Sequence, residues 1–323
     1  MEYTLNSNGP RLFGILPTYA RQKLLGDTLR AVMSQTRPPD VFVIVDNESS
    51  PKTKQLVEQF QADFPDRDVQ YVASPENLGS AGGWALAFEH SIGQTKDSDW
   101  FVTLDDDDPP IFIDDLEKVF EFAIEQKQND PSIGAAGIVG ARFDWRRGFL
   151  ERLGDAELHG PIEVDYVGNN HLAMYPASVV RKVGGFRKEL FFGNTEVEYC
   201  LRLRNMGYRI VANGDLWRKR REHSNRLGIT VKPSRVCSDR WKKYYTIRNY
   251  IYMMLRFGRL DLALKQALIQ IALKPLYTVP SDWQLAQRGF KLAVRATVDG
   301  FRGNMGRTVK PDDFTSKKVL SQT

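Results

Sequence analysis

Four consecutive aspartates, Asp105 to Asp108, follow the apolar segment Trp100–Leu104. Adjacent carboxylates repel one another, so such a run disfavours folding unless a positive group lies among them. In an extended chain Asp105 and Asp107 point to the same side, where both can contact one ion. Carboxylate oxygens suit Mg²⁺ or Mn²⁺, which commonly bridge to substrate phosphates. A solvated acidic turn is the alternative, and Asp108, which precedes Pro109, is expected to be structural.

A second segment with the composition of a ligand-binding turn is Asn77–Gly83, which contains three glycines and enters a predicted helix. Glycine lets the backbone approach a ligand closely, and a helix N-terminus favours anions. The segment matches neither the P-loop nor the dinucleotide-binding fingerprint. A tight turn that lets the helix pack closely is the alternative explanation.

The elements that must position these residues alternate along the front of the chain. Strands are expected at 12–16, 41–45, 69–73 and 100–104, and helices at 27–34, 52–60 and 79–90. The β-branched run Val41–Val45 has no polar alternation, which is typical of a strand covered on both faces. The order predicts an α/β fold with a doubly wound, mostly parallel sheet. Ligands of such sheets bind at the carboxyl ends of the strands, where polar and acidic residues recur in this sequence.

The composition narrows the class of protein. The chain has 323 residues, 42% of them apolar and 26% charged, which predicts a globular protein of one large or two modest domains. Two cysteines without a paired metal-binding spacing argue against a disulfide scaffold and a cysteine zinc site. The polar segment Met1–Pro10 has no apolar signal core, and no uncharged stretch reaches about 18 residues. We therefore expect a cytoplasmic protein without a membrane-spanning helix.

The net charge of +5 is distributed unevenly. Residues 1–215 carry a net charge of −11, whereas residues 216–259 contain 13 basic and 2 acidic residues. Residues 260–323 add a further +5. This asymmetry predicts two parts, 1–215 and 216–323, and a basic rear should attract phosphate, nucleic acid or anionic lipid.

Four motifs occur in order along the chain and together carry a family resemblance. They are Leu16–Tyr19 with Val45–Asn47, Asn77–Gly83, Leu104–Asp107, and Phe192–Arg202. This set resembles family 2 glycosyltransferases of the GT-A fold, and within them bacterial galactofuranosyl- and rhamnosyl-transferases. The resemblance covers roughly residues 10–255. It implies an inverting transfer of galactofuranose or rhamnose from a UDP- or dTDP-linked donor, with Mn²⁺ or Mg²⁺ as cofactor.

The resemblance also implies an acceptor and a division of labour. The acceptor would be a hydroxyl of a glycan or lipid-linked glycan in cell-surface polysaccharide assembly. Residues 1–215 would be the nucleotide-sugar-binding and catalytic domain, and residues 216–323 a mainly helical region completing the site. The donor-binding residues implied are Pro17, Thr18, Tyr19, Asp46, Asn77, Gly79, Gly82, Gly83, Asp105 and Asp106. The metal ligands implied are Asp105, Asp107 and His223, the histidine favouring Mn²⁺.

The choice of catalytic base rests on the segment 194–207, a predicted helix closed by Gly207. The family usually has an acidic pair where this chain has Thr195-Glu196. Thr195 and Glu198 match a capping box, which would give Glu198 a structural role. Glu196 is then free to face the site, and the helix N-terminus should lower its pKa and keep it ionised as a general base.

Three further residues are candidates for the acceptor side. Trp84, just after the glycines, is expected either to pack against a sugar or to belong to the core. Asn170 and His171 are expected to face the acceptor, with a buried loop histidine as the alternative.

The basic rear mixes cations with aromatic residues in Trp217–Arg221 and Arg240–Tyr245. Nucleic-acid binding and peripheral membrane binding share this composition. The segment 241–255 has apolar residues at helical spacing, and 260–276 continues in that style. A helical cap with a solvated basic face is a third explanation. Because no nucleic-acid-binding motif is present, we expect contact with an anionic membrane surface on the inner face of the cell membrane, and no nucleic acid.

Two other functions compete with sugar transfer. A sugar-nucleotide nucleotidyltransferase would share the fold and the metal, but usually carries a glycine-rich loop with an arginine after the first strand. Here that position holds Pro17-Thr18-Tyr19-Ala20-Arg21, with no glycine. A non-catalytic nucleic-acid-binding protein would explain the basic rear but would leave the aspartates without a purpose.

Overall fold

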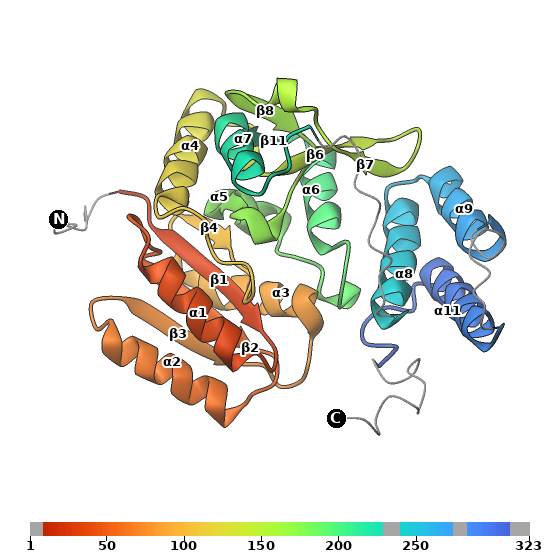
Figure 1. The fold of residues 1–323 in the computed structure, drawn as a ribbon, viewed down its shortest axis with the longest axis horizontal. Coiled ribbons are helices and arrows are strands. Elements are labelled where there is room, and N and C mark those ends of the chain that lie inside the picture. The colour runs from red at the N-terminus through yellow and green to blue at the C-terminus, as the bar shows by residue number, and fades with distance from the viewer. Residues whose placement is uncertain (1–8, 229–239, 274–282, 311–323) are drawn as a thin grey trace.

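The computed structural model describes residues 9–228, 240–273 and 283–310 (Figure 1). An eight-stranded sheet, in the order β3-β2-β1-β4-β10-β5-β11-β8, forms its centre. A three-stranded sheet, β7-β6-β9, lies beside it. The strands are β1 (Leu12–Thr18), β2 (Val41–Asp46), β3 (Asp68–Ala73), β4 (Trp100–Thr103), β5 (Ile133–Gly137), β6 (Gly140–Asp144), β7 (Phe149–Glu151), β8 (Pro161–Val164), β9 (Tyr166–Val167), β10 (Met174–Pro176) and β11 (Arg209–Asn213).

Helices pack around the central sheet and form the C-terminal part of the described chain (Figure 1). The α-helices are α1 (Gln22–Met33), α2 (Pro51–Asp63), α3 (Gly79–Ser91), α4 (Asp115–Asn129), α5 (Ala177–Val183), α6 (Thr195–Asn205), α7 (Gly214–His223), α8 (Arg240–Arg256), α9 (Leu260–Leu268) and α11 (Trp283–Arg302). Short helical turns are η1 (Ile92–Gln94), η2 (Asp155–Glu157), η3 (Asn169–His171), η4 (Lys188–Leu190) and the π-helical η5 (Ile269–Leu273).

The predicted fold class is confirmed. Strands β3, β2, β1 and β4 are parallel, as their alternation with helices predicted, whereas β10 and β8 run antiparallel to their neighbours. Every residue of β2 is buried, in agreement with its continuous apolar run. Strand β1 extends to Thr18, two residues beyond the predicted end at Leu16. Because β4 pairs only with residues 12–15 of β1, Pro17 lies past the ladder on that side, where its missing N–H costs nothing.

The apolar side chains form two clusters. The first covers the central sheet and its helices and includes Leu216 and Trp217 of α7. The second joins α8, α9 and α11 and includes Phe191 and Leu201 from the sheet-containing part. The division of the chain at residue 215 stays a prediction.

The predicted helix over 241–255 is confirmed as α8, but its apolar side chains are not displayed to a membrane. Tyr244, Tyr245, Ile251 and Met254 are fully buried in the second cluster. Of the segment 260–276, α9 and η5 are described, and 274–276 lie outside the described residues. None of the helices in the described ranges combines the length and hydropathy needed to cross a bilayer.

Candidate active site

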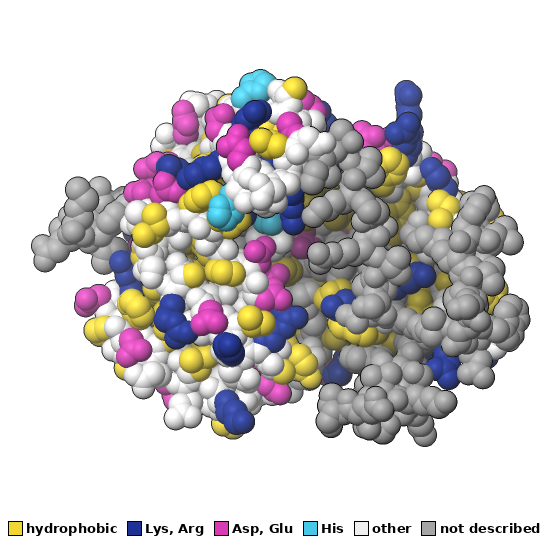
Figure 2. Space-filling view, in the orientation of Figure 1, with side chains coloured by type: hydrophobic (Ala, Val, Ile, Leu, Met, Phe, Trp, Pro, Cys, Tyr) yellow, Lys and Arg dark blue, Asp and Glu magenta, His cyan; other side chains and the backbone are white. Residues whose placement is uncertain are grey.

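A cavity of about 720 Å³ lies at the carboxyl ends of β1 and β4. The predicted residues that line it are Pro17, Thr18, Tyr19, Asn77, Gly79, Trp84, Asp105, Asp106, Asp107 and Glu196. Lining residues without a predicted role are Arg21, Asn47, Ser80, Phe191, Phe192, Gly193, Trp241, Lys242, Arg307 and Lys310. Figure 2 shows acidic and basic side chains next to one another near the middle of the face it displays.

Three carboxylates follow β4 and converge at the cavity. Asp105, Asp106 and Asp107 each offer an oxygen, and these oxygens lie within 4.8 Å of one another. In the described part of the chain, these three aspartates are the side chains whose arrangement is suited to hold a metal ion. Three oxygen donors at this spacing fit a hard divalent cation such as Mg²⁺ or Mn²⁺.

Asp106 is the carboxylate most tightly bound by the protein itself. The Thr18 hydroxyl donates to its Oδ2 at 2.7 Å, and the Arg21 guanidinium donates to its Oδ1 at 2.9 Å. Arg21 also donates to Asp107 Oδ2 at 2.5 Å. Asp106 therefore holds the loop in place, and Asp105 and Asp107 are better placed to contact an ion.

The raised pKa of Asp105 indicates that negative charges repel one another at this site. Burial raises the pKa of Asp105 to about 7, and the charges of Asp107, Asp106 and Glu196 add to the effect. A carboxyl with that pKa is about half protonated at neutral pH, unlike an ordinary aspartate. A cation among the three carboxylates would offset this repulsion.

Glu196 is in the first turn of α6 and lines the same cavity as the aspartates. The helix begins after Asn194, whose φ of 58° is left-handed and whose side-chain amide donates to the carbonyl of Thr246. The predicted pKa shift was wrong in sign. Burial raises the pKa of Glu196, and a hydrogen bond from its own backbone N–H opposes this only in part. Desolvation outweighs the helix N-terminus here.

The predicted capping box of α6 was also wrong. Asn194, not Thr195, is the N-cap residue, and the Thr195 hydroxyl is buried without a hydrogen-bond partner among the described residues. Glu198 is nevertheless structural. It is buried and accepts hydrogen bonds from Arg187 Nε at 2.8 Å and from Arg202 Nε at 3.1 Å.

This ion-pair network gives a prediction about stability. Glu198→Gln removes the charge that faces the two largely buried guanidinium groups, so the free energy of unfolding should fall by about 2–3 kcal/mol. Urea unfolding at neutral pH measures the change. Glu89→Gln on the exposed surface of α3 is the matched control and should lie within about 0.5 kcal/mol of wild type. Wild-type stability combined with loss of activity would instead identify Glu198 as the functional carboxylate.

The glycine-rich turn at the start of α3 serves both to pack the helix and to line the cavity. Gly79 has a φ of +68°, and a Cβ there would collide with the carbonyl of Phe191. That carbonyl accepts a hydrogen bond from the Ala81 N–H, so one donor at this helix N-terminus is already occupied. Gly82 and Gly83 are buried and do not line the cavity. A Cβ on Gly83 would lie 2.5 Å from Cβ of Pro17, so its role is close packing.

Asp46 is buried, and its carboxylate is fully engaged by the protein. It accepts hydrogen bonds from the backbone N–H groups of Glu48 and Ser50 and from the Tyr71 hydroxyl. It does not line the cavity, whereas its neighbour Asn47 does. Asn47 Oδ1 is buried and has no hydrogen-bond partner in the described part of the chain, which leaves it available to a ligand.

Of the three residues predicted to contact the acceptor, one lines the cavity and two do not. Trp84 lines the cavity but is only 4% exposed and packs against Phe186. Asn170 and His171 do not line the cavity. Asn170 donates to Asp108, as the structural role predicted for that aspartate requires, and Arg220 donates to His171 Nδ1 at 3.0 Å.

The two histidines with predicted roles have different surroundings. Burial and the charge of Arg220 lower the pKa of His171 to about 4, so this side chain is neutral at pH 7. His223 is exposed at the end of α7, and its ring packs against Phe112. His223 is not part of the group formed by the three aspartates.

Residues 240–310 supply a basic and aromatic wall to the cavity that the aspartates line. Trp241 and Lys242 come from the first turn of α8, and Arg307 and Lys310 follow α11. Residues 216–323 were expected to complete the site, but none of these four residues was predicted to line it, and the cations of the rear were assigned to a membrane surface. No local signal could have found this wall, because the contact joins segments far apart in the chain.

Two buried polar residues of α8 hold this wall against the segment that precedes α6. Arg248 is fully buried and donates to the carbonyls of Leu190 and Gly306. Asn249 donates to the carbonyls of Phe192 and Gly193, which belong to residues that line the cavity. The charge of Arg248 is therefore used inside the protein rather than on its surface.

Comparison with solved structures supports the fold. The mannosyltransferase PcManGT from Pyrobaculum calidifontis, in complex with GDP-Man and Mn²⁺, aligns with a TM-score of 0.55 and 18% identity. The alignment covers 91% of this chain and 76% of that one. Staphylococcus aureus TarS, residues 1–349, aligns with a TM-score of 0.54 and 14% identity, over 90% and 80% of the two chains.

Sequence relatives are similar over part of their length. Galactofuranosyltransferase GlfT1 of Mycolicibacterium smegmatis is 30% identical over 203 residues, which are 60% of this chain and 65% of the relative. A putative teichuronic acid biosynthesis glycosyltransferase, TuaG of Bacillus subtilis, is 29% identical over 36% of this chain and 43% of its own. The family model for glycosyl transferase family 2 matches residues 15–184, just over half of the chain, which contain the second half of β1, the strands β2 to β4 and the aspartate motif. The chain therefore belongs to glycosyl transferase family 2.

Proposed function

We propose that this protein transfers a sugar from a nucleotide-diphosphate donor to a hydroxyl of a glycan or lipid-linked glycan, with inversion at the anomeric carbon. One observation carries the proposal. The aspartate group and the partly exposed carboxylate of Glu196 share a cavity that basic and aromatic side chains also line. Such a cavity offers a place for a diphosphate and a proton acceptor for an incoming hydroxyl.

The negative charge of the donor diphosphate would be balanced by a metal ion and by basic side chains. A divalent cation held by Asp105 and Asp107 would neutralise the diphosphate and stabilise it as a leaving group. Arg307 and Lys242 line the same cavity and supply positive charge from the protein. Asn47 and Ser80 offer polar groups that can orient the nucleotide or the sugar.

Glu196 acts as the base in this scheme. Its carboxylate takes the proton of the acceptor hydroxyl while that oxygen attacks the anomeric carbon, and the bond to the diphosphate breaks on the opposite face. One displacement of this kind inverts the configuration and leaves the nucleoside diphosphate as the second product. No covalent enzyme intermediate forms, so the site requires no nucleophilic side chain.

Galactofuranose from a UDP-linked donor is the first candidate for the transferred sugar, because relatives with 30% and 34% identity are galactofuranosyltransferases. Rhamnose from a dTDP-linked donor follows from the motif resemblance. Mn²⁺ is favoured by the likeness to a mannosyltransferase that was solved with that ion. Cell-surface polysaccharide assembly agrees with the name of the TuaG relative.

The basic wall predicts a defect in donor binding. Arg307→Ala removes one cation from the cavity, so KM for the donor should rise about tenfold while kcat changes much less, the expectation for binding lost equally in ground and transition states. Steady-state kinetics with varied donor measures the split. Arg30→Ala, an exposed position on α1 paired with Asp27, is the control and should leave both constants unchanged. An unchanged KM in Arg307→Ala would remove the basic wall from the donor site.

The function itself is tested by incubating the full chain with UDP-galactofuranose or dTDP-rhamnose, Mn²⁺ and a polyprenyl-linked glycan acceptor. We expect nucleoside diphosphate release and a product one sugar longer, and a rise in melting temperature with the true donor because a ligand stabilises only the folded state it binds. A protein that is stabilised by no nucleotide sugar, but is stabilised by a nucleoside triphosphate with sugar phosphate, would be a nucleotidyltransferase instead.

A further inference from the structure

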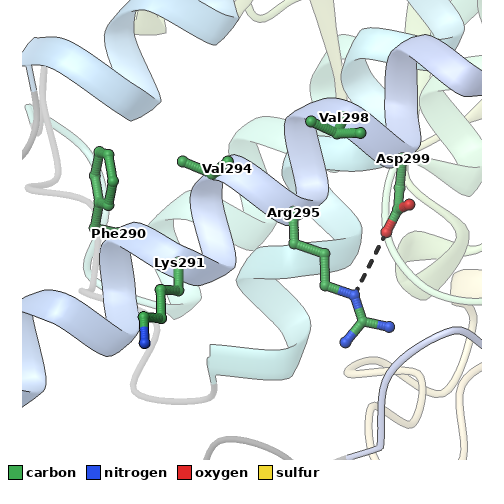
Figure 3. A pocket seen from close by; sticks show the side chains of 6 residues that line it. All are labelled: Phe290, Lys291, Val294, Arg295, Val298 and Asp299. Carbon is green, nitrogen blue, oxygen red and sulfur yellow. Dashed lines mark ion pairs between the residues drawn. The ribbon is translucent and has the colours of Figure 1, made fainter.

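Helix α11 has an exposed apolar stripe along one side. Phe290, Val298 and Phe301 are 44%, 38% and 37% exposed, and Val294 lies between them at the same helical spacing. Figure 3 shows Phe290, Val294 and Val298 along one edge of the helix. Three- and four-residue spacing puts all four on one side of the helix.

Basic side chains border this stripe. Lys291, Arg295 and Arg302 are exposed, and each follows one of the apolar positions by one residue, which places it about 100° further around the helix. The acidic residue of the described helix, Asp299, forms an ion pair with Arg295, which leaves Lys291 and Arg302 as the main cations of the border (Figure 3). Asp299 is buried, and it accepts hydrogen bonds from the Tyr244 hydroxyl and the Asn304 amide.

A second helix of the same bundle has similar exposure. Leu260, Leu264 and Leu268, four residues apart on α9, are each more than half exposed. Both α9 and α11 lie beyond α8 as seen from the central sheet (Figure 1). The exposed apolar side chains of the C-terminal part are therefore concentrated on its outer helices.

We propose that the exposed face of α11, together with the leucines of α9, docks the protein on an anionic lipid bilayer. An apolar stripe bordered by cations is the pattern of a helix that lies in the membrane interface, with aromatic and aliphatic side chains among the acyl chains and lysine or arginine at the headgroups. A second copy of this chain is a poorer occupant, because the same rows of cations would face each other. The proposal does not depend on which reaction the cavity catalyses.

This surface differs from the one expected from the sequence. The aromatic and apolar residues of α8 are packed inside the second cluster, and Trp241 and Lys242 line the cavity. Helices α9 and α11 therefore carry the exposed apolar surface that α8 lacks.

The position of α11 also links the proposed membrane surface to the cavity. Its last residue, Arg302, is five residues before Arg307, a lining residue. Five residues span at most about 17 Å when extended. A protein docked through α11 would therefore hold its cavity close to the bilayer, within reach of the head of a lipid-linked molecule.

Co-sedimentation of the full chain with vesicles tests the proposal. We expect binding to vesicles of phosphatidylcholine with about a quarter phosphatidylglycerol at low salt, weaker binding at 0.5 M salt, and little binding to pure phosphatidylcholine. The double variant Lys291→Glu/Arg302→Glu should lower the partition coefficient at least about tenfold. Lys52→Glu/Lys96→Glu changes the net charge equally on the sheet-containing part and should bind like the wild type.

The apolar stripe is tested separately. Phe290→Gln/Val298→Gln should also lower the partition coefficient at least about tenfold, because each exposed side chain would lose its contact with the acyl region. Leu24→Gln/Met206→Gln, which changes two apolar residues of similar exposure elsewhere, is the matched control and should keep binding. Circular dichroism and urea unfolding verify that each variant is folded.

Equal loss of binding in the α11 variants and in their controls would overturn the proposal, as would no binding by the wild type at low salt. A dimer that dissociates in Phe290→Gln/Val298→Gln, with vesicle binding unchanged, would assign the surface to a second copy. Because partition into vesicles is measured without any sugar transfer, its outcome is independent of the proposed reaction.

Discussion

Glu196→Gln should lower kcat at least about a hundredfold while the donor still binds. The substitution keeps the size of the side chain and removes its capacity to accept a proton, and general-base catalysis contributes about this much or more. Glu196 is suited to the role because it lines the cavity that also contains the aspartate group. Turnover with saturating donor and acceptor, together with a donor-binding isotherm, measures the two quantities.

The pH dependence of the wild type gives a second readout for Glu196. A base must be ionised, and burial raises the pKa of Glu196 above the ordinary glutamate value of 4.5. At a Mn²⁺ concentration high enough to keep Asp105 ionised, activity should therefore rise with pH through an acidic limb that lies above that value, and Glu196→Gln should lose the limb. Glu89→Gln, on the surface of α3, should keep both the rate and the limb. An active Glu196→Gln enzyme with an unchanged profile would assign the base to another group.

Asp107→Ala should reduce transfer to below about one-thousandth of the wild-type rate, and EDTA should do the same to the wild type. A cation on a transferring group's phosphates contributes several kcal/mol of transition-state stabilisation, which corresponds to this factor. Asp107 faces the cavity beside Asp105, and their oxygens are among those within 4.8 Å of one another.

Two controls separate loss of the metal from loss of the fold. Titration of Mn²⁺ followed by electron paramagnetic resonance should show a bound ion in the wild type and none in Asp107→Ala. Asp97→Ala, whose carboxylate is exposed on the surface, should keep both the bound ion and the activity. Full transfer in the presence of EDTA would contradict the metal-dependent mechanism.

The parts of the site that follow from local sequence were predictable. The run Val41–Val45 has the composition of a strand buried on both faces, and β2 is such a strand. Asp105 and Asp107 come directly after β4, and the carboxyl end of a parallel strand is where a ligand is expected. Both predictions needed only the order of neighbouring residues.

Predictions that depended on where a single side chain points were less accurate. Asp46 was predicted to contact the nucleotide, but its carboxylate accepts the N–H groups of Glu48 and Ser50. Aspartate side chains commonly accept hydrogen bonds from backbone N–H groups of the turn that follows them, and this preference could have predicted the structural role of Asp46. Asn47, the next residue, lines the cavity instead.

Other features depend on contacts between distant segments and leave no local trace. Glu198 meets Arg187, which belongs to a different segment, so the ion pair could not be distinguished from a capping box by spacing alone. The burial that raises the pKa of Glu196 likewise comes from the surrounding fold rather than from α6. The cations Lys242 and Arg307 line the same cavity as the aspartates only after the chain has folded back on itself.

Residues from both ends of the described chain form the cavity wall, and this affects how the chain folds during its synthesis. Pro17 and Lys310 line one cavity although they stand near opposite ends of the described residues. A nascent chain can assemble β1 to β4 early, because domains fold from the N-terminus during translation. It lacks the partner of Arg248 at Gly306 and the cation of Arg307 until those residues have left the ribosome. An unfinished chain therefore has the aspartates and Arg21 but lacks Arg307, and it should neither retain nor consume a nucleotide sugar.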